Sequence, residues 1–247
     1  MALAIGSRFG WKGILVVLVL AGVAYLGSAL LGGGTASQTV TANGSQGAGQ
    51  QDELARFVGV VLDDTQATWR AQVPGYQGTR VVLFTGAVAS ACGTTTSAVG
   101  PFYCPLDSQV YIDLAFYADL RQRYGAPGDF AQAYVIAHEV GHHVQHQYGL
   151  LAASGGSVAT ELQADCIAGA WARDASARHI VDVGDMDEAM NAASQIGDDT
   201  LQRRNDGYVQ PETWTHGSAA QRSSSFARGV QSGLVGCGIP AATTASR

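Results

Sequence analysis

The segment that most constrains the fold is 130-FAQAYVIAHEVGHHVQHQY-148, in which four histidines and a glutamate interrupt an otherwise apolar run. The segment is apolar on nearly every helical face, so we expect it in the interior. Asp129, with Gln132 three residues later, forms a capping-box pattern at its start, and Gly149 is a suitable stop. Buried histidines without partners are costly. The segment therefore predicts a central helix whose histidines bind a ligand.

Within this helix, 138-HEVGH-142 has the H-E-x-x-H spacing. Residues i and i+4 project from one helical face roughly 6 Å apart, so His138 and His142 can hold one zinc ion. Glu139 lies beside the open coordination position, where it can accept a proton from zinc-bound water. The small Gly141 allows another element to approach closely. The alternative is a helix with histidines on a solvated face, and the apolar neighbours argue against it.

A second pair, His142 and His146, has the same i, i+4 spacing. No glutamate follows it at the matching position, so His138 and His142 are the preferred ligand pair. We expect His143 and His146 behind the ligands or on the surface.

A catalytic zinc site needs a third protein ligand and keeps one position open for water. The third histidine of the metzincin pattern is absent after His142. A carboxylate from a second helix is the other solution, and 161-ELQAD-165 offers one 19 residues beyond His142. Glu161 is predicted to bind the metal, and Asp165 to accept the N–H of a ligating histidine. The alternative is a solvated acidic face, but the neighbouring residues are apolar or small.

Peptide hydrolysis also needs a donor that stabilises an oxyanion. His216 precedes the expected cap of the last helix by two residues, so it lies on a loop near a helix N-terminus. It is our catalytic candidate outside the central helix, with a surface-loop histidine as the alternative. His179 has no such context and is expected on the surface.

Residues 13-GILVVLVLAGVAYLGSALL-31 form a stretch of 19 positions without a charge. At about 1.5 Å per residue, a helix of this length spans roughly 28 Å, close to the hydrocarbon core of a bilayer. The only charges before it are basic, so we expect a single transmembrane helix with residues 1–12 in the cytoplasm and the rest exported. A cleaved signal peptide is the alternative, because small residues at 35-TAS-37 could form a cleavage site.

The remaining patterns predict an α+β fold that is mostly helical with a small sheet. In chain order they predict a helix over 52–72 with Asp52 as N-cap, a strand over 79–88, a loop over 90–105, a strand over 109–114, and helices over 115–125, 158–178 (capped by Ser157), from Asp185 to about Arg204, and from Ser218 to about Ser232. The domain map is a cytoplasmic N-terminus (1–12), a transmembrane helix (13–31), a flexible Gly/Ser/Thr/Gln linker (32–51), a folded domain (52–240) and a C-terminal tail (241–247).

Charge and cysteine content limit the partners and the compartment. The net charge of −6 and the absence of a basic run argue against nucleic-acid binding. The four cysteines allow three disulfide connectivities, and an even number in an exported domain favours two disulfides. Pairing Cys92 with Cys104 closes a short loop and leaves Cys166 with Cys237. Four buried thiols in a reducing compartment are the alternative.

The sequence resembles the bacterial family of putative neutral zinc metallopeptidases, which are often membrane-anchored, over nearly the whole exported part. The matching segments are 99-VGPFYCPLDSQVYIDLAFYADL-120, 128-GDFAQAYVIAHEVGHHVQ-145, 161-ELQADCIAGAWA-172, 196-IGDDTLQ-202 and 215-THGSAAQR-222, with Cys237 near the end. The resemblance implies a zincin-like domain of the gluzincin type, in which His138, His142 and Glu161 bind zinc and Glu139 is catalytic. It also implies that 109–114 is the edge strand beside the cleft, to which a substrate strand could add.

These observations predict a membrane-tethered, extracytoplasmic zinc metalloendopeptidase that binds one zinc ion and acts on a peptide or protein. The alternative from another functional class is a catalytically silent, zinc-stabilised binding or scaffold module of the cell envelope. A cytoplasm-facing, multi-span membrane peptidase is a third interpretation, and the single hydrophobic stretch argues against it.

Overall fold

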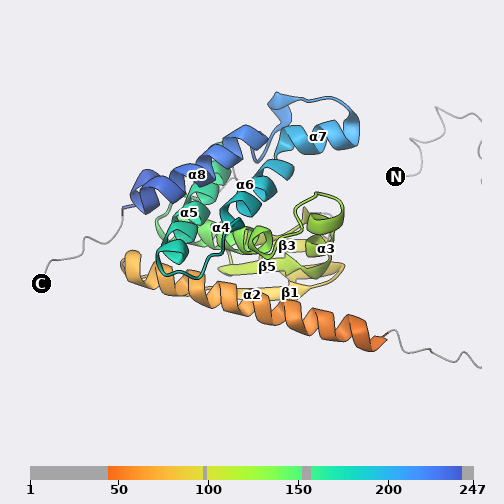
Figure 1. Cartoon of the computed structure of the whole chain (residues 1–247), viewed down its shortest axis with the longest axis horizontal. Helices are drawn as coiled ribbons and strands as arrows, with labels where there is room; N and C mark the ends of the chain where they lie inside the picture. The colour runs from red at the N-terminus through yellow and green to blue at the C-terminus, as the bar shows by residue number, and fades with distance from the viewer. Residues whose placement is uncertain (1–43, 97–98, 152–156, 241–247) are drawn as a thin grey trace, which may run out of the picture. The chain divides into compact units, whose positions relative to one another are not determined.

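The computed structural model describes residues 44–96, 99–151 and 157–240 (Figure 1). The expected transmembrane segment 13–31, most of the expected linker and the tail 241–247 lie outside these residues. None of the described helices is both long and apolar enough to cross a bilayer.

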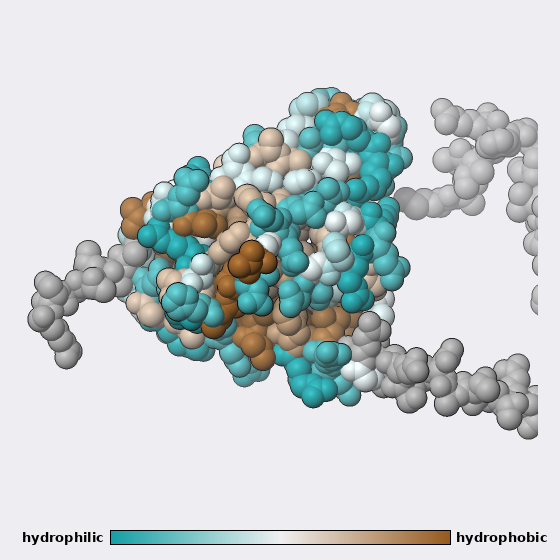
Figure 2. All heavy atoms as spheres, in the orientation of Figure 1, coloured by the Kyte–Doolittle hydropathy of each residue, from teal (hydrophilic) through white to brown (hydrophobic). Residues whose placement is uncertain are grey.

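The described chain is mostly helical, with five short strands, which confirms the α+β expectation. In chain order the elements are α2 (Gly44–Gln72), β1 (Arg80–Phe84), β2 (Ala87–Ser90), β3 (Gly93–Thr96), β4 (Phe102–Cys104), β5 (Gln109–Asp113), α3 (Leu114–Gln122), α4 (Asp129–Gln147), α5 (Val158–Ala177), α6 (Asp185–Gln195), α7 (Asp198–Asp206), the 3₁₀ turn η2 (Pro211–Thr213) and α8 (Ala219–Gly236). Figure 1 shows the long α2 running along one side of the sheet and the helices α5, α6 and α8 on the other side. On the face drawn in Figure 2, the surface over α7 is largely hydrophilic, and hydrophobic side chains gather between α2 and the lower end of α6.

The strand β5 is the centre of a three-stranded sheet with the order β1-β5-β4. It pairs in parallel with β1 and antiparallel with β4, so the expectation that 109–114 is an edge strand is wrong. The edge strands are β1 and β4, and β4 lies in the segment expected to be a loop. Its three residues stand between Pro101 and Pro105, so they are too few to show strand alternation in the sequence. The expected strand 79–88 is also divided, because Gly86 turns with a φ of 85° between β1 and the hairpin β2–β3.

The helix α4 lies in the core, as predicted, and two neighbouring helices approach closely because glycines face the contacts. A Cβ on Gly141 of α4 would lie 3.1 Å from the backbone oxygen of Ala164 on α5, so this glycine has the role expected for it. Between α5 and α8 the packing is closer still. A Cβ on Gly169 would lie 2.0 Å from the backbone oxygen of Phe226, and one on Gly229 would lie 1.8 Å from a backbone oxygen of α5. These contacts fix α4, α5 and α8 relative to one another, and the metal centre described below is built on these helices.

Several helix ends differ from the expectation because distant residues act as caps. The N-cap of α4 is Gly128 and not Asp129, and the expected box with Gln132 does not form. Instead, Glu188 at the start of α6 accepts a hydrogen bond from the backbone N–H of Phe130 at 3.3 Å. A carboxylate at a helix N-terminus also interacts favourably with the helix dipole. A local sequence pattern cannot reveal a cap that lies 58 residues away.

Two other helix boundaries differ from the expectation. The helix α2 begins at Gly44 and not after Asp52, so residues 44–51, expected to be linker, are helical. The expected helix from Asp185 to about Arg204 is two helices, α6 and α7, separated at Gly197. A Cβ at Gly197 would lie 2.3 Å from the backbone nitrogen of Ala219, so the start of α8 occupies the space at this break. The caps at Ser157 and Ser218 form as predicted, the second as a full capping box.

Both expected disulfides are present. Cys92 and Cys104 join the hairpin β2–β3 to β4, and Cys166 and Cys237 join α5 to the end of α8. No described cysteine is free.

Candidate metal centre

Three ligand atoms predicted from the sequence converge on one point. Oε2 of Glu161 lies 3.2 Å from Nε2 of His138 and 3.4 Å from Nε2 of His142. The three residues place one ligand atom each within 4.8 Å of one another. A tetrahedral zinc ion with bonds of about 2.0–2.2 Å holds its ligand atoms about 3.3–3.5 Å apart. Two imidazoles and a carboxylate at these separations fit zinc and leave its fourth position free for another ligand.

Each imidazole is oriented by a hydrogen bond at its other nitrogen. Nδ1 of His138 lies 2.8 Å from Oδ1 of Asp165, and Nδ1 of His142 lies 2.8 Å from Oε1 of Gln145. Because a carboxylate and an amide oxygen accept hydrogen bonds, both Nδ1 atoms carry the proton. Both Nε2 lone pairs then face Glu161, as metal ligation requires. Asp165 lies where the sequence analysis expected it, whereas Gln145 was not predicted.

The amide of Gln145 is itself fixed by two hydrogen bonds. Its Nε2 donates to the backbone oxygen of Thr160 at 2.8 Å and to Oε1 of Gln163 at 2.9 Å. These donors assign the amide orientation, so Oε1 is the atom that faces His142. The residue is fully buried in α4. The i, i+3 spacing from His142 is the sequence signal that could have revealed it.

Asp165 is held by a buried network that the sequence analysis missed. Arg222 of α8 donates from Nε to Oδ2 and from one terminal nitrogen to Oδ1, both at 2.9 Å. Tyr134 donates to the same Oδ1 at 2.5 Å and accepts from Arg222 at 3.0 Å. The exposed fraction of Asp165 is 0% and that of Arg222 is 3%. Burial would raise the pKa of Asp165, but Arg222 and His138 outweigh burial and hold it below its ordinary value, so the carboxylate is ionised.

Local spacing indicates only part of this network. Tyr134 lies one helical turn before His138, on the same face of α4. Arg222 is the last residue of the segment 215–222, in which the sequence analysis selected only His216 as a candidate functional residue. The contact between α8 and α5 that brings Arg222 to Asp165 crosses 57 residues of sequence.

The two glutamates of the centre differ in charge environment. Glu161 is subject to burial, which would raise its pKa, but the neighbouring imidazoles of His138 and His142 outweigh burial and hold the pKa well below its ordinary value. Burial raises the pKa of Glu139, although the nearby histidines oppose the change. Glu139 is 6% exposed and makes no hydrogen bond with the other described residues through its carboxylate. Glu161 is therefore suited to bind a cation, and Glu139 to take up and release a proton.

His216 lies on the loop before α8 and lines the same cleft as the predicted ligands. Its side chain is 49% exposed, and its Nδ1 lies 3.5 Å from Oδ1 of Asp198. Oδ2 of Asp198 accepts the backbone N–H groups of Thr215 and His216 at 2.7 Å and of Gly217 at 3.0 Å. Burial would raise the pKa of Asp198, but these interactions with His216 and Gly217 lower it to about 2. Asp198 therefore fixes the position of the loop that carries His216. The sequence analysis did not predict this role, although Asp198 lies in the segment 196–202 that matches the family.

The cleft has a volume of about 1090 Å³ and two chemically different walls. The helical wall includes the side chains of Tyr134, His138, Glu139, His142, Glu161 and Arg222. The sheet wall consists of Phe102 and Tyr103 of β4 and the flanking residues Val99, Gly100, Pro101, Pro105 and Leu106, with Cys92 of the hairpin. Val99 and Leu106 are exposed and apolar. The helical wall therefore presents charged groups, and the sheet wall presents an edge of β4 that pairs with no other described strand and has an apolar rim.

The other two histidines of α4 contact the sheet wall and not the metal centre. The hydroxyl of Tyr103 lies 2.9 Å from Nδ1 of His143 and 2.8 Å from Nδ1 of His146. Burial lowers the pKa of His143. His142 and His146 therefore do not converge with Glu161 on one metal position. The pair that converges with Glu161 is His138 and His142. Tyr103 was missed because its strand was not predicted.

Comparison with known proteins places these observations in context. Residues 1–238 match the family described as "Putative neutral zinc metallopeptidase". The uncharacterized protein YpfJ of Escherichia coli (strain K12) is 45% identical over 200 residues, which cover 74% of this chain and 70% of that protein. The uncharacterized protein Rv2575 of Mycobacterium tuberculosis (strain H37Rv) is 43% identical over 190 residues, which cover 69% of this chain and 65% of that protein. No solved structure matches.

Proposed function

Because the chain belongs to the family of putative neutral zinc metallopeptidases, we propose that it hydrolyses peptide bonds in the cleft between the helical wall and the sheet wall. The observation that carries the proposal is the convergence of His138, His142 and Glu161 beside the buried carboxylate of Glu139. A structural zinc site is usually closed by four protein ligands, whereas a catalytic one keeps an open position. Only three ligand residues meet here among the described residues, and they face a large cleft.

Zinc, when bound, supplies a Lewis acid that polarises a carbonyl and makes water more acidic. Glu139 takes the proton of the attacking water and delivers it to the leaving amine, and its raised pKa suits both transfers. His216, which lines the same cleft, donates a hydrogen bond to the developing oxyanion. Asp198 keeps the His216 loop in place through its three backbone hydrogen bonds.

The substrate is proposed to be an extended peptide that adds to the free edge of β4. This strand pairs only with β5 among the described strands, and it lines the cleft. An unpaired strand edge offers backbone N–H and C=O groups to an incoming strand. The apolar rim at Val99 and Leu106 suits a peptide with apolar side chains. We therefore propose β4, and not the segment 109–114, as the edge strand to which the substrate peptide adds.

We further propose that residues 13–31 tether the domain to the membrane with the cleft outside the cytoplasm. The two disulfides support an oxidising compartment, since such bonds are rare in cytosolic proteins. The test is to block free thiols in intact cells before lysis and then to count blocked cysteines by mass. We expect no blocked cysteine. Four blocked cysteines would place the domain in a reducing compartment.

The enzymatic proposal is tested with the full chain, purified in mild detergent, beside its Glu139→Gln variant. We expect about one zinc ion per chain in both proteins, and cleavage of a peptide library by the wild type alone. Loss of the general base should lower the rate by about 10²–10⁴-fold. A zinc chelator should abolish cleavage.

The matched control is Glu212→Gln, because Glu212 is an exposed glutamate of η2 outside the cleft. It should keep both zinc and activity. Zinc without cleavage in any of the three proteins would favour the binding or scaffold module, and the absence of zinc would reject the metal centre.

A further inference from the structure

Where α3 ends, the cleft carries two arginines around one tyrosine, a group that we call the arginine cluster. Arg123 and Tyr124 both line the cleft. The guanidinium carbon of Arg123 lies 5.6 Å from the centre of the Tyr124 ring, and that of Arg204 on α7 lies 5.5 Å from it. Arginine is attracted to aromatic rings in this way, so Tyr124 holds both cations near one place. Leu201, one turn before Arg204, also lines the cleft, so this face of α7 is turned toward it.

Neither arginine of the cluster has an anionic partner among the described residues. Arg123 donates to the side-chain oxygen of Asn205 at 3.4 Å, and Arg204 donates to that of Gln195 at 2.9 Å. Both partners are neutral amides, and no described carboxylate lies within ion-pair distance of either guanidinium. Asp119 also lines the cleft, but it is one exposed carboxylate beside two cations. The arginine cluster therefore keeps a positive charge in a chain whose net charge is −6.

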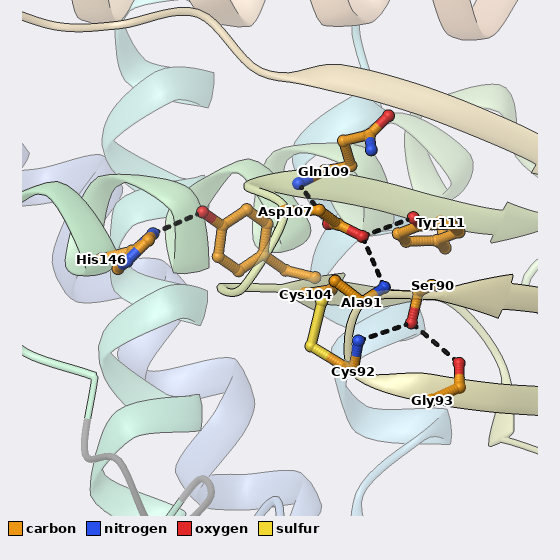
Figure 3. Close-up of a disulfide and its surroundings, with 10 residues drawn as sticks. Ser90, Ala91, Cys92, Gly93, Cys104, Asp107, Gln109, Tyr111 and His146 are labelled. Atoms are coloured by element: carbon orange, nitrogen blue, oxygen red, sulfur yellow. Dashed lines mark hydrogen bonds between the residues drawn. A yellow bond between two sulfur atoms is a disulfide. The ribbon is translucent and has the colours of Figure 1, made fainter.

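The strand β4 leads to the arginine cluster through two contacts of aromatic rings. A Cβ on Gly100, two residues before β4, would lie 3.7 Å from the ring of Phe116 on α3. The rings of Phe116 and Tyr124 have their centres 6.2 Å apart. The opposite end of β4 is Cys104, whose disulfide to Cys92 ties it to the hairpin (Figure 3). The start of β4 therefore lies on the side of the arginine cluster, and its end lies on the side of the hairpin.

The helix α4 presents the same features in the same order. Tyr103 of β4 contacts His146 in the last turn of α4. The segment 123–128, which contains two members of the arginine cluster, leads directly into the first turn of α4. The predicted zinc ligands His138 and His142 lie between these two ends of the helix. A peptide that runs along β4 past the metal centre therefore approaches the arginine cluster.

The direction of the added strand decides which part of the peptide meets the arginines. Antiparallel pairs outnumber parallel ones by about two- to three-fold and are slightly more stable per residue. A peptide antiparallel to β4 has its N-terminal part beside Cys104 and its C-terminal part beside Gly100. We propose that Arg123 and Arg204 bind a carboxylate on the C-terminal side of the bond to be cleaved, either the α-carboxylate of a peptide end or an acidic side chain. A guanidinium suits this group because it can donate two parallel hydrogen bonds to a carboxylate.

This inference rests on the proposed function for its ligand class, and binding can be measured without cleavage. The protein is the zinc-loaded full chain carrying Glu139→Gln, titrated by fluorescence anisotropy. All probes are alanine-rich hexapeptides with leucine at the third position and fluorescein at the N-terminus. The first pair has a free or an amidated C-terminus. The second pair is amidated and has glutamate or glutamine at the sixth position, and the third pair has these residues at the second position.

We expect the charged member of the first or the second pair to bind more tightly than its neutral partner by about 3- to 10-fold, as for one or two accessible charge pairs. The pair that shows this preference identifies the source of the carboxylate. Arg123→Gln and Arg204→Gln should each reduce the preference, and the double substitution should remove it, with the affinity for the neutral peptides unchanged. Salt at about 0.5 M should weaken the preference, because mobile ions screen accessible charges.

The matched control is Arg121→Gln, at an exposed arginine of α3 that does not line the cleft. It should leave the preference unchanged. Because every charged probe has a neutral partner, a general disturbance of the cleft would weaken both members of a pair equally. The ratio of the two affinities therefore reports the carboxylate contact and not the stability of the cleft.

Equal affinity for the charged and neutral members of the first two pairs would overturn the inference. A preference that persists in the double variant would overturn it too, as would a preference in the third pair alone, which would mean the opposite direction of the peptide. No binding of any probe to the zinc-loaded chain would overturn it as well. A preference carried by the two arginines without cleavage by the wild type would reject the peptidase proposal alone.

Discussion

The two walls of the cleft are held in place by different means. On the helical wall, Asp165 and Arg222 are buried together, and each polar group satisfies another. On the sheet wall, strands of three to five residues carry the cleft surface, and the hairpin β2–β3 lies outside the main sheet. Buried polar networks are costly when incomplete, so they permit one arrangement only. The comparison suggests that the helical wall sets the metal geometry and the sheet wall adapts to the peptide.

Specific contacts attach the hairpin β2–β3 to the rest of the sheet wall. Asp107 accepts hydrogen bonds from the backbone of Ala91 at 2.9 Å and from the hydroxyl of Tyr111 at 2.8 Å (Figure 3). The disulfide between Cys92 and Cys104 is a covalent link, and Val88 of β2 also packs against the cluster of Phe84, Cys104 and Tyr111. The disulfide ends one residue from Tyr103, so the hairpin is coupled to the residue that contacts His146.

Arg222→Met should have the largest effect, because it breaks the network of the helical wall. The substitution leaves Asp165 buried without its guanidinium partner. Removal of one member of a buried ion pair costs about 3–5 kcal/mol of unfolding free energy. Zinc affinity should fall as well, because Asp165 orients His138. Denaturant unfolding and zinc content are the measurements.

Arg228→Met is the matched control for this prediction, since Arg228 is exposed on the same helix. Its unfolding free energy should stay within about 0.5 kcal/mol of the wild type. An equally small effect of Arg222→Met would show that the buried pair does not hold the helical wall.

The two disulfides allow the walls to be compared directly. Replacing Cys166 and Cys237 by alanine removes a disulfide between residues that are 71 positions apart in the sequence. Replacing Cys92 and Cys104 removes one between residues that are 12 positions apart. The chain-entropy relation gives losses of about 4 and about 3 kcal/mol, respectively. Only the second pair should also raise KM for a cleaved peptide, because it releases β4. Urea unfolding measures the two losses of stability, and steady-state kinetics measure KM. A rise in KM on replacement of Cys166 and Cys237 alone would mean that the helical wall, and not the sheet wall, controls peptide binding.

The parts of the metal centre that the sequence predicted are those within one helix. The pairs His138 with His142 and Glu161 with Asp165 share a face because four residues make about one turn. Helical spacing is a local property, so these positions could be assigned without knowledge of the fold. The α+β class and both disulfides could also be predicted, because apolar periodicity and cysteine spacing indicate them.

The parts that the sequence did not predict depend on contacts between elements. Arg222 reaches Asp165 from another helix, and Tyr103 reaches His146 from a three-residue strand. The cap of α4 by Glu188 is of the same kind. Such partners are chosen by packing, which no residue pattern in one segment reports. The errors therefore lie mainly on the sheet wall and at helix ends.

Gln145→Leu tests whether the hydrogen bond to His142 matters as much as the one to His138. The substitution removes the acceptor of the Nδ1–H of His142 and leaves this group unpaired in the interior. Loss of such a partner typically lowers metal affinity by 10- to 100-fold, about 1.4–2.7 kcal/mol. Competition for zinc with a chromophoric chelator gives the affinity. Gln231→Leu, at an exposed position of α8, is the control and should bind zinc as the wild type does.

The smallest effect is expected at a solvent-accessible ion pair that does not line the cleft, which contrasts with the buried pair of the helical wall. Asp64 of α2 accepts hydrogen bonds from Arg178 at 2.9 Å and from Trp171 of α5 at 2.8 Å. The hydrogen bond from Arg178 is the main cause that lowers the pKa of Asp64 in the folded protein. The pair therefore stabilises the fold above the unfolded-state pKa of about 3.9, and this contribution is lost as the pH falls through the lower folded-state value.

Asp64→Asn should lower the unfolding free energy at pH 7 by no more than about 1 kcal/mol, because solvent screens a solvent-accessible pair. The difference from the wild type should shrink between pH 5 and pH 3, and added salt should reduce it at pH 7. Urea unfolding at these three pH values measures it, with the exposed neighbour Asp63→Asn as the control. A loss at pH 7 as large as that of Arg222→Met would mean that burial is not what distinguishes the two ion pairs. A difference that grows toward pH 3 would contradict the sign of the pKa change.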